Sequence, residues 1–76
     1  MTNMDANRFS QVLRKFRVLR GLSQEEVALQ AGLHRTYVSQ LERNVKSPSL
    51  RTAMILARVL GVPFSEFAQA LESEDV

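Results

Sequence analysis

The sequence contains no cysteine and no tryptophan, and His34 is its single histidine. Without thiols the chain can form neither a disulfide scaffold nor a thiolate metal or redox site. One histidine without cysteine partners also argues against zinc. We therefore expect no metal and no cofactor. A chain without cysteine fits the cytoplasm, where we expect this protein to act.

Long apolar runs are also missing. No stretch approaches the roughly 18 apolar residues that a membrane-spanning helix needs, and residues 1–5 show no basic region followed by an apolar stretch. We therefore expect no membrane partner and no secretory signal. The sequence has no glycine-rich phosphate loop and no cluster of carboxylates in opposed environments, so we expect neither an enzyme nor a small-molecule ligand.

What is present fits one globular domain over residues 1–76, of which 45% are apolar. Charge is divided unevenly along it. Residues 1–51 carry nine Lys/Arg and four Asp/Glu, whereas residues 52–76 carry one Arg and four acidic residues. The first part is suited to an anionic partner, although many surfaces are lopsided by chance.

Glycine and asparagine divide the chain into segments with the apolar spacing of amphipathic helices. The spacing predicts five helices and no strands, an all-α domain whose core covers about residues 6–71 and whose residues 72–76 are frayed. The expected helices cover about 5–20, 24–31, 35–43, 49–60 and 64–71. The inward stripe of the first is Phe9, Val12, Leu13, Phe16 and Leu19, and that of the fourth is Leu50, Ala53, Leu56, Ala57 and Leu60.

The second helix begins with a strong start signal. Ser23 and Glu26 have the spacing of a capping box, in which each side chain accepts a hydrogen bond from the other residue's backbone N–H. Gly32 ends this helix after barely two turns, and only two residues separate it from the next. Helices joined so tightly cross steeply, as in a helix-turn-helix over about 23–43. His34 is not among the usual helix caps; it could cap the third helix, contact phosphate or do neither.

Residues 21–28 and 32–44 read Gly-Leu-Ser-Gln-Glu-Glu-Val-Ala and Gly-Leu-His-Arg-Thr-Tyr-Val-Ser-Gln-Leu-Glu-Arg-Asn. Together with residues 48–50 and 56–62, they resemble the Cro/C1-type (XRE) helix-turn-helix family. The resemblance covers about residues 8–71, and in so short a chain it looks especially like the controller proteins of restriction–modification systems. It implies a compact five-helix repressor-like domain, of bacterial or phage origin, that binds double-stranded DNA and regulates transcription.

By this resemblance, the third helix enters the major groove, which admits one helix. Arginine can donate two hydrogen bonds to guanine, glutamine can pair with adenine, and threonine can offer a hydroxyl or a methyl group. Composition alone describes an ordinary solvated face equally well, but the whole motif favours base reading. The candidate base-reading residues, opposite the buried pair Val38 and Leu41, are Arg35, Thr36, Ser39 and Gln40.

Phosphate contacts are expected around the third helix and at the start of the second. The candidates are Arg17, Gln24, Tyr37, Arg43, Asn44 and Lys46. By resemblance, the amide of Gln24 also braces the start of the third helix. Arg17 matches a position that pairs with Glu42 and points at the DNA backbone, although Glu42 could instead be a plain surface charge.

One helix in one groove discriminates too little. A good bidentate contact gives roughly 1–3 kcal/mol, whereas a specific site needs about 4–10 kcal/mol over other DNA. We therefore expect a homodimer on a palindromic operator, paired through the fourth and fifth helices. The candidate interface residues, which could instead all close the core of one chain, are Ile55, Val59, Phe64, Phe67 and Leu71.

Bound near a promoter, such a dimer could exclude RNA polymerase or recruit it, and the sequence favours neither. The rival function is an antitoxin-like or other protein-interaction module, in which the same fold holds a partner protein. RNA binding is less favoured, because the aromatic residues are mostly phenylalanines at core spacing and leave no stacking platform.

Overall fold

The computed structural model describes the backbone of residues 4–72 and the side chains of residues 8–71. Within that part of the chain there are five helices and no strand, so the predicted all-α fold is confirmed. The helices are α1 (Met4–Leu19), α2 (Gln24–Ala31), α3 (Arg35–Glu42), α4 (Leu50–Val59) and α5 (Phe64–Glu72). Of the residues 72–76 predicted to be frayed, Glu72 is instead the last residue of α5, and the other four lie outside the described part.

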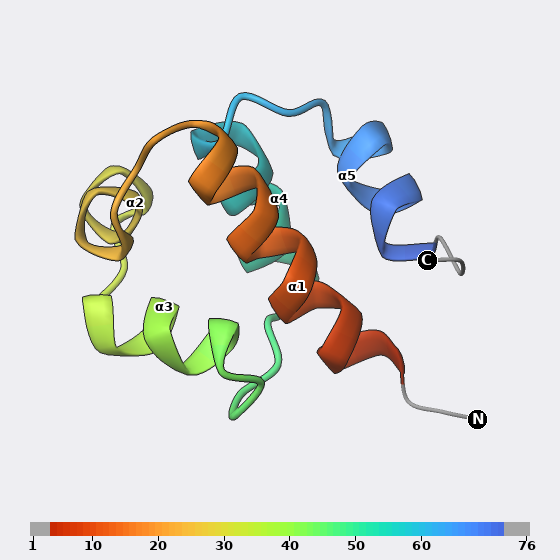
Figure 1. The fold of residues 1–76 in the computed structure, drawn as a ribbon, viewed down its shortest axis with the longest axis horizontal. Helices are drawn as coiled ribbons and strands as arrows, with labels where there is room; N and C mark the ends of the chain where they lie inside the picture. Colours follow the sequence, from red (N-terminus) through yellow and green to blue (C-terminus); the bar gives the residue numbers. More distant parts are fainter. Residues whose placement is uncertain (1–3, 73–76) are drawn as a thin grey trace.

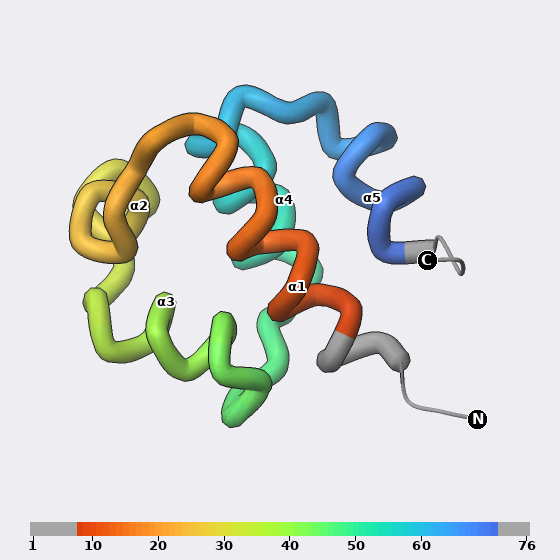
Figure 2. Tube along the Cα trace, viewed as in Figure 1, coloured from red at the N-terminus to blue at the C-terminus, as the bar shows by residue number. Residues whose placement is uncertain are grey.

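The helix α1 crosses the middle of the molecule, with α3 on one side of it and α5 on the other (Figure 1). It packs against both, while α2 packs against α3 and α4, and α4 packs against α5. The tube in Figure 2 shows that a short turn joins α2 to α3 and that α3 runs along one edge of the molecule. α3 therefore has an inner side against the core and an outer side that no other helix covers.

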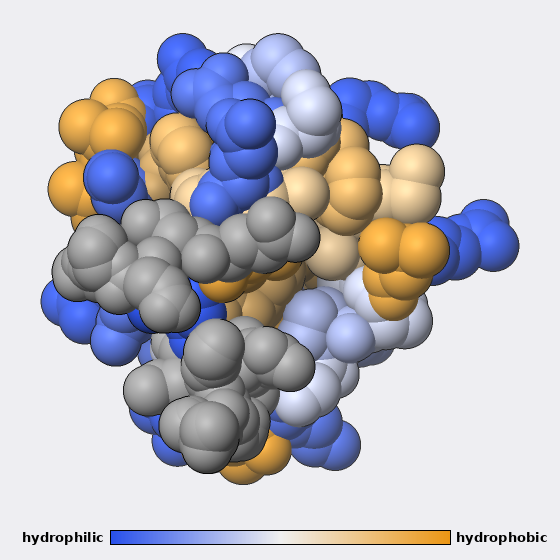
Figure 3. All heavy atoms as spheres, turned by 90° about the vertical axis from the view of Figure 1, so that its right-hand side faces the viewer, coloured by the Kyte–Doolittle hydropathy of each residue, from blue (hydrophilic) through white to orange (hydrophobic). Residues whose placement is uncertain are grey.

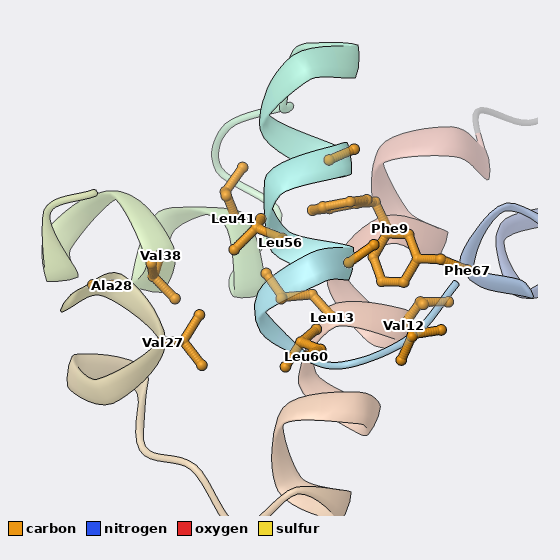
Figure 4. Close-up of a cluster of buried hydrophobic side chains, with 13 residues drawn as sticks. Phe9, Val12, Leu13, Val27, Ala28, Val38, Leu41, Leu56, Leu60 and Phe67 are labelled. Atoms are coloured by element: carbon orange, nitrogen blue, oxygen red, sulfur yellow. The ribbon is translucent and has the colours of Figure 1, made fainter. Parts of the chain in front are cut away.

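One apolar cluster fills the space between the helices. Phe67 of α5 meets Phe9 of α1 edge to face, with ring centroids 5.8 Å apart and an interplanar angle of 79° (Figure 4). Burying a large apolar side chain contributes about 1.5–3 kcal/mol, so this cluster holds all five helices in one unit. Its fully buried large side chains are Leu13, Val27, Val38, Leu41, Leu56, Leu60 and Phe67.

Two residues predicted to face the core are exposed instead. Leu19 is 67% exposed and Leu50 is 68% exposed. Leu19 is the last residue of α1 and Leu50 is the first of α4. The apolar stripe of each helix therefore extends beyond the part that neighbouring helices cover, and the leucine at the helix end is exposed to solvent.

Local signals set the helix ends as the sequence predicted. The Ser23 hydroxyl accepts from the Glu26 backbone N–H at 2.9 Å, and the Glu26 carboxylate accepts from the Ser23 backbone N–H at 2.8 Å. Gly32 ends α2 with a φ of 71°, and Asn44 has the same left-handed conformation with a φ of 61°. Asparagine tolerates this conformation better than most side chains do. His34 stands at the N-cap of α3 and makes no capping bond with its side chain.

No single helix in the described part of the chain is long and apolar enough to cross a membrane. α4 and α5 reach that length and composition only when taken together, and the chain bends by 116° between them.

Candidate nucleic-acid interface

The outer side of α3 carries most of the polar residues predicted to read bases. Arg35, Thr36 and Ser39 line one recess of about 350 Å³, and Arg43 completes its wall. Val38 and Leu41 are buried on the opposite side of the helix. The structure therefore brings three of the four predicted base-reading residues to one surface.

Gln40, the fourth, lies half-buried on the flank of α3. Its backbone carbonyl accepts from the N–H groups of Val45 and Lys46, at 2.8 and 3.3 Å. These bonds close the turn after α3 around the left-handed Asn44. The turn thus holds Asn44 and Lys46, both exposed, beside the end of the helix.

Glu42, the last residue of α3, is the centre of a hydrogen-bond network. Its Oε2 accepts from Arg17 Nε at 2.6 Å, and its Oε1 accepts from Arg17 Nη2 and Gln24 Nε2, both at 3.0 Å. The side chains of Glu42 and Arg17 are only 5% and 14% exposed. The hydrogen bond to Glu42 raises the pKa of the Arg17 guanidinium, and burial opposes that shift. The predicted ion pair is confirmed.

This network fixes the orientation of α3, because its members come from three helices. Arg17 stands in the last turn of α1 and Gln24 is the first residue of α2. The prediction that Gln24 braces the start of α3 is wrong: its amide binds the end. The acceptor is the carboxylate of Glu42, 18 positions further along the chain, which Arg17 holds in the same network.

Arg17 has less capacity for phosphate than its position suggested. Besides its two bonds to Glu42, its Nη1 donates to the Leu22 carbonyl at 2.9 Å. All three guanidinium nitrogens thus donate within the protein, so we regard Arg17 first as a positioning residue for α3. Of the other predicted phosphate contacts, Arg43 is exposed and Tyr37 is half-buried against the core.

A further link between helices was not foreseen from the sequence. Arg20 Nε donates to the Leu60 carbonyl at 2.6 Å, and its Nη2 donates to the Gly61 carbonyl at 3.2 Å. The last carbonyls of a helix have no partner within it, so Arg20, the residue that follows α1, satisfies the end of α4. Because the partners are 40 and 41 positions apart, no local pattern could have revealed this contact.

The prediction that Phe67 lies in the dimer interface is wrong. Phe67 is fully buried, and its ring contacts those of Phe9, Phe16 and Phe64 at centroid distances of 5.8, 6.0 and 6.4 Å. It lies on the inward side of α5, where it closes the core of one chain and has no surface left for a partner.

The remaining predicted interface residues are half-buried, and three of the four also pack against the core. They are Ile55, Val59, Phe64 and Leu71. Figure 3 turns the α5 side of the molecule to the viewer and shows orange and tan apolar surface among blue hydrophilic groups. The assignment of these four residues to an interface stays a prediction.

Five helices with a tight α2–α3 turn and a polar, uncovered α3 define a helix-turn-helix protein. Comparison with protein families agrees: residues 13–67 match the family described as "Helix-turn-helix". The chain therefore belongs to the helix-turn-helix family of DNA-binding transcriptional regulators.

Individual relatives confirm the Cro/C1-type resemblance. The chain is 41% identical to control protein C.SmaI of Serratia marcescens over 64 residues, which cover 82% of this chain and 76% of the relative. It is 38% identical to control protein C.BamHI of Bacillus amyloliquefaciens over 63 residues, which cover 82% and 78%. The wild-type restriction–modification controller protein C.Esp1396I matches the fold with a TM-score of 0.86, at 28% identity and 93% coverage of each chain.

Proposed function

We propose that this protein is the controller of a restriction–modification system and that it binds a palindromic operator as a dimer. The observation that carries the proposal is the outer side of α3, where Arg35, Thr36 and Ser39 line one polar recess. A network centred on Glu42 ties this helix to α1 and α2. Two control proteins among the relatives, each aligned over 82% of this chain, support the more specific role.

In this proposal the start of α3 reads bases and its surroundings contact the DNA backbone. Arg35 can donate two hydrogen bonds to guanine O6 and N7, and Thr36 can offer its hydroxyl to a base or its methyl group to thymine. Ser39 and Gln40 add polar groups further along the helix. Phosphate contacts, which position the protein without reading sequence, come from Gln24, Tyr37, Asn44 and Lys46, with a secondary part for Arg17.

The proposed dimer interface lies on α5 and one flank of α4. Ile55 and Val59 are one turn apart on that flank, and Phe64 and Leu71 continue the half-buried apolar surface onto α5. α3 lies on the other side of α1 from α5 (Figure 1). Pairing through α4 and α5 thus leaves both copies of α3 free for the two half-sites.

The dimer needs no small molecule in this proposal, because its own concentration determines how much of the operator is occupied. Bound near a promoter, it excludes RNA polymerase at one site or recruits it at another. The proposal requires a cytoplasmic location, since that is where the DNA of a bacterium or an infecting phage lies.

The test is a titration of the purified protein against the duplex immediately upstream of its own gene, with a shuffled duplex as control, at two salt concentrations. We expect tight binding to the native duplex alone, with two chains per site. Binding should weaken with salt by a log–log slope of about 0.9 for each phosphate contact. Weak and equal binding to both duplexes would contradict the proposal and favour an antitoxin-like module, whose partner would then be sought in the neighbouring gene product.

The controller role has its own test. We expect a restriction endonuclease or methyltransferase gene beside this one, and we expect its transcript level to change when this chain is deleted. Specific DNA binding with unchanged transcripts of both enzymes would leave a regulator of this family but would contradict the controller role.

A further inference from the structure

Arg43 lies on the side of α3 that is farthest from the core. It is the C-cap residue, and its backbone N–H still donates to the Ser39 carbonyl at 2.9 Å, so the winding of the helix reaches as far as Arg43. Thr36 and Arg43 are seven positions apart, so they lie within about 20° of each other around the helix axis. Val38 and Leu41, the buried pair, point the opposite way.

Ser39 lies between Thr36 and Arg43 and holds the arginine in place. Arg43 Nε donates to Ser39 Oγ at 3.3 Å, and both side chains line the recess with Arg35 and Thr36. The hydroxyl thus takes one N–H of the guanidinium. The terminal Nη1 and Nη2 groups remain as a two-pronged donor, the form that matches guanine O6 and N7.

We propose that Arg43 reads a base edge in the major groove instead of contacting the phosphate backbone, and that Ser39 positions it. The inference rests on the proposed function, since it requires α3 to lie in the groove. A helix so placed turns its outer side to the base edges and its flanks to the two strands. At about 1.5 Å per residue, Arg43 lies about 10 Å along α3 from Thr36. With 3.4 Å between steps, that distance corresponds to about three base pairs.

The test begins with the wild-type protein, which enriches its preferred duplex from a randomised pool. Affinities for every single-base-pair variant of that duplex are then measured for wild type, Thr36→Ala, Arg43→Ala, Arg43→Lys and Ser39→Ala. Arg14→Ala is the matched control, because Arg14 is an exposed arginine of α1 outside the recess. Thermal unfolding of each variant checks that the exposed substitutions leave the fold intact.

We expect Arg43→Ala and Arg43→Lys to lose discrimination at the same base pair of each half-site, about three base pairs from the pair affected by Thr36→Ala. Wild-type discrimination there should be roughly 5- to 150-fold and should fall close to 1. Ser39→Ala should reduce it in part, and Arg14→Ala should leave it unchanged. Arg43→Lys retains the charge, so its salt dependence should stay that of wild type.

Full discrimination by Arg43→Lys would overturn the inference and leave the proposed function standing. So would a uniform loss of affinity in Arg43→Ala, with a salt slope smaller by about 0.9, because that is the behaviour of a phosphate contact. Failure of the wild-type protein to enrich any duplex would instead overturn the proposed function, and this inference with it.

Discussion

The outer sides of α3 and α4 differ in chemistry although both helices bury an apolar stripe. α3 presents Arg35, Thr36 and Arg43. α4 leaves Leu50 68% and Met54 49% exposed, one turn apart and at least about 100° around the helix from Ile55. The contrast does not lie in charge, because α4 also carries two exposed arginines, Arg51 and Arg58.

The two surfaces therefore gain free energy from different partners. Polar and cationic groups gain little from one another on a solvated surface, but they gain from a polyanion whose counterions they release. Apolar surface gains roughly 25 cal/mol for each Å² that a partner removes from water. α3 is thus suited to DNA, and the exterior of α4 and α5 is suited to another protein surface, a second copy of this chain in our proposal.

The largest effect should come from Phe67→Ala, which tests whether α5 belongs to the core or to the interface. A buried phenylalanine contributes about 3–5 kcal/mol relative to alanine, and about 4–8 °C of Tm correspond to each kcal/mol in a domain of this size. We therefore expect Tm to fall by at least about 12 °C. Phe64→Ala, at a half-buried position, is the milder control. A Phe67→Ala protein that melts like wild type but no longer dimerises would show that Phe67 belongs to the interface and not to the core.

Next in size is Glu42→Ala, which tests whether the network holds the DNA-facing surface in place. Removing this carboxylate leaves the mostly buried Arg17 guanidinium without its counter-ion and the Gln24 amide without its acceptor. Breaking such a pair costs about 3 kcal/mol or more. We expect a lower free energy of unfolding in urea and weaker binding to all DNA, because α3 loses its fixed orientation.

The exposed carboxylate of Glu25 provides the matched control for Glu42. Glu25→Ala should change stability by no more than about 0.5 kcal/mol. If Glu42→Ala were equally mild and its DNA affinity unchanged, the pair with Arg17 would be a surface contact without influence on α3.

The sequence predicted the helices well because their limits depend on few residues. Ser23 and Glu26 are three positions apart and cap each other, and Gly32 and Asn44 stop helices through their own backbone preferences. The outer side of α3 followed from its spacing, since burial of Val38 and Leu41 determines which residues point away. Such features are local, so a single sequence contains them.

What the sequence could not give depends on how distant segments meet. Arg20 finds its acceptors at residues 60 and 61 only because α1 passes the end of α4. Gln24 likewise binds Glu42, 18 positions away, and not the start of α3. Periodicity shows that Phe67 and Ile55 are on apolar faces, but it does not say whether the chain itself or a partner covers each face.

Ile55→Asp should have a smaller effect on folding and a specific effect on pairing. A charge on the proposed flank of α4 opposes burial of that flank by a second copy, and loss of a central interface contact commonly costs about 2 kcal/mol. We expect the dimer dissociation constant, measured by sedimentation equilibrium, to rise about 30-fold, and operator binding to weaken with it.

Met54→Asp is the control for this prediction, because Met54 lies about 100° around α4 from Ile55, on the side of Leu50, and is more exposed. We expect it to leave dimerisation unchanged. The reverse result, with Met54→Asp dissociating the dimer and Ile55→Asp sparing it, would move the interface to the flank that also carries Leu50.

The smallest effect should be that of Asn44→Gly, in which stability and DNA affinity should move in opposite directions. Glycine adopts the left-handed φ of 61° without the steric cost that a side chain has there, so unfolding should become less favourable by about 0.5 kcal/mol. The same change removes the amide proposed to contact phosphate, so the affinity should fall by the same factor for every duplex.

Asn44→Ala is the control, because it keeps the steric cost of a side chain and also lacks the amide. It should lower the free energy of unfolding by about 1 kcal/mol and weaken DNA binding as much as Asn44→Gly does. If Asn44→Gly bound DNA as well as wild type, the role of Asn44 would be confined to the turn. Lys46 would then be the residue that contacts phosphate at this end of α3.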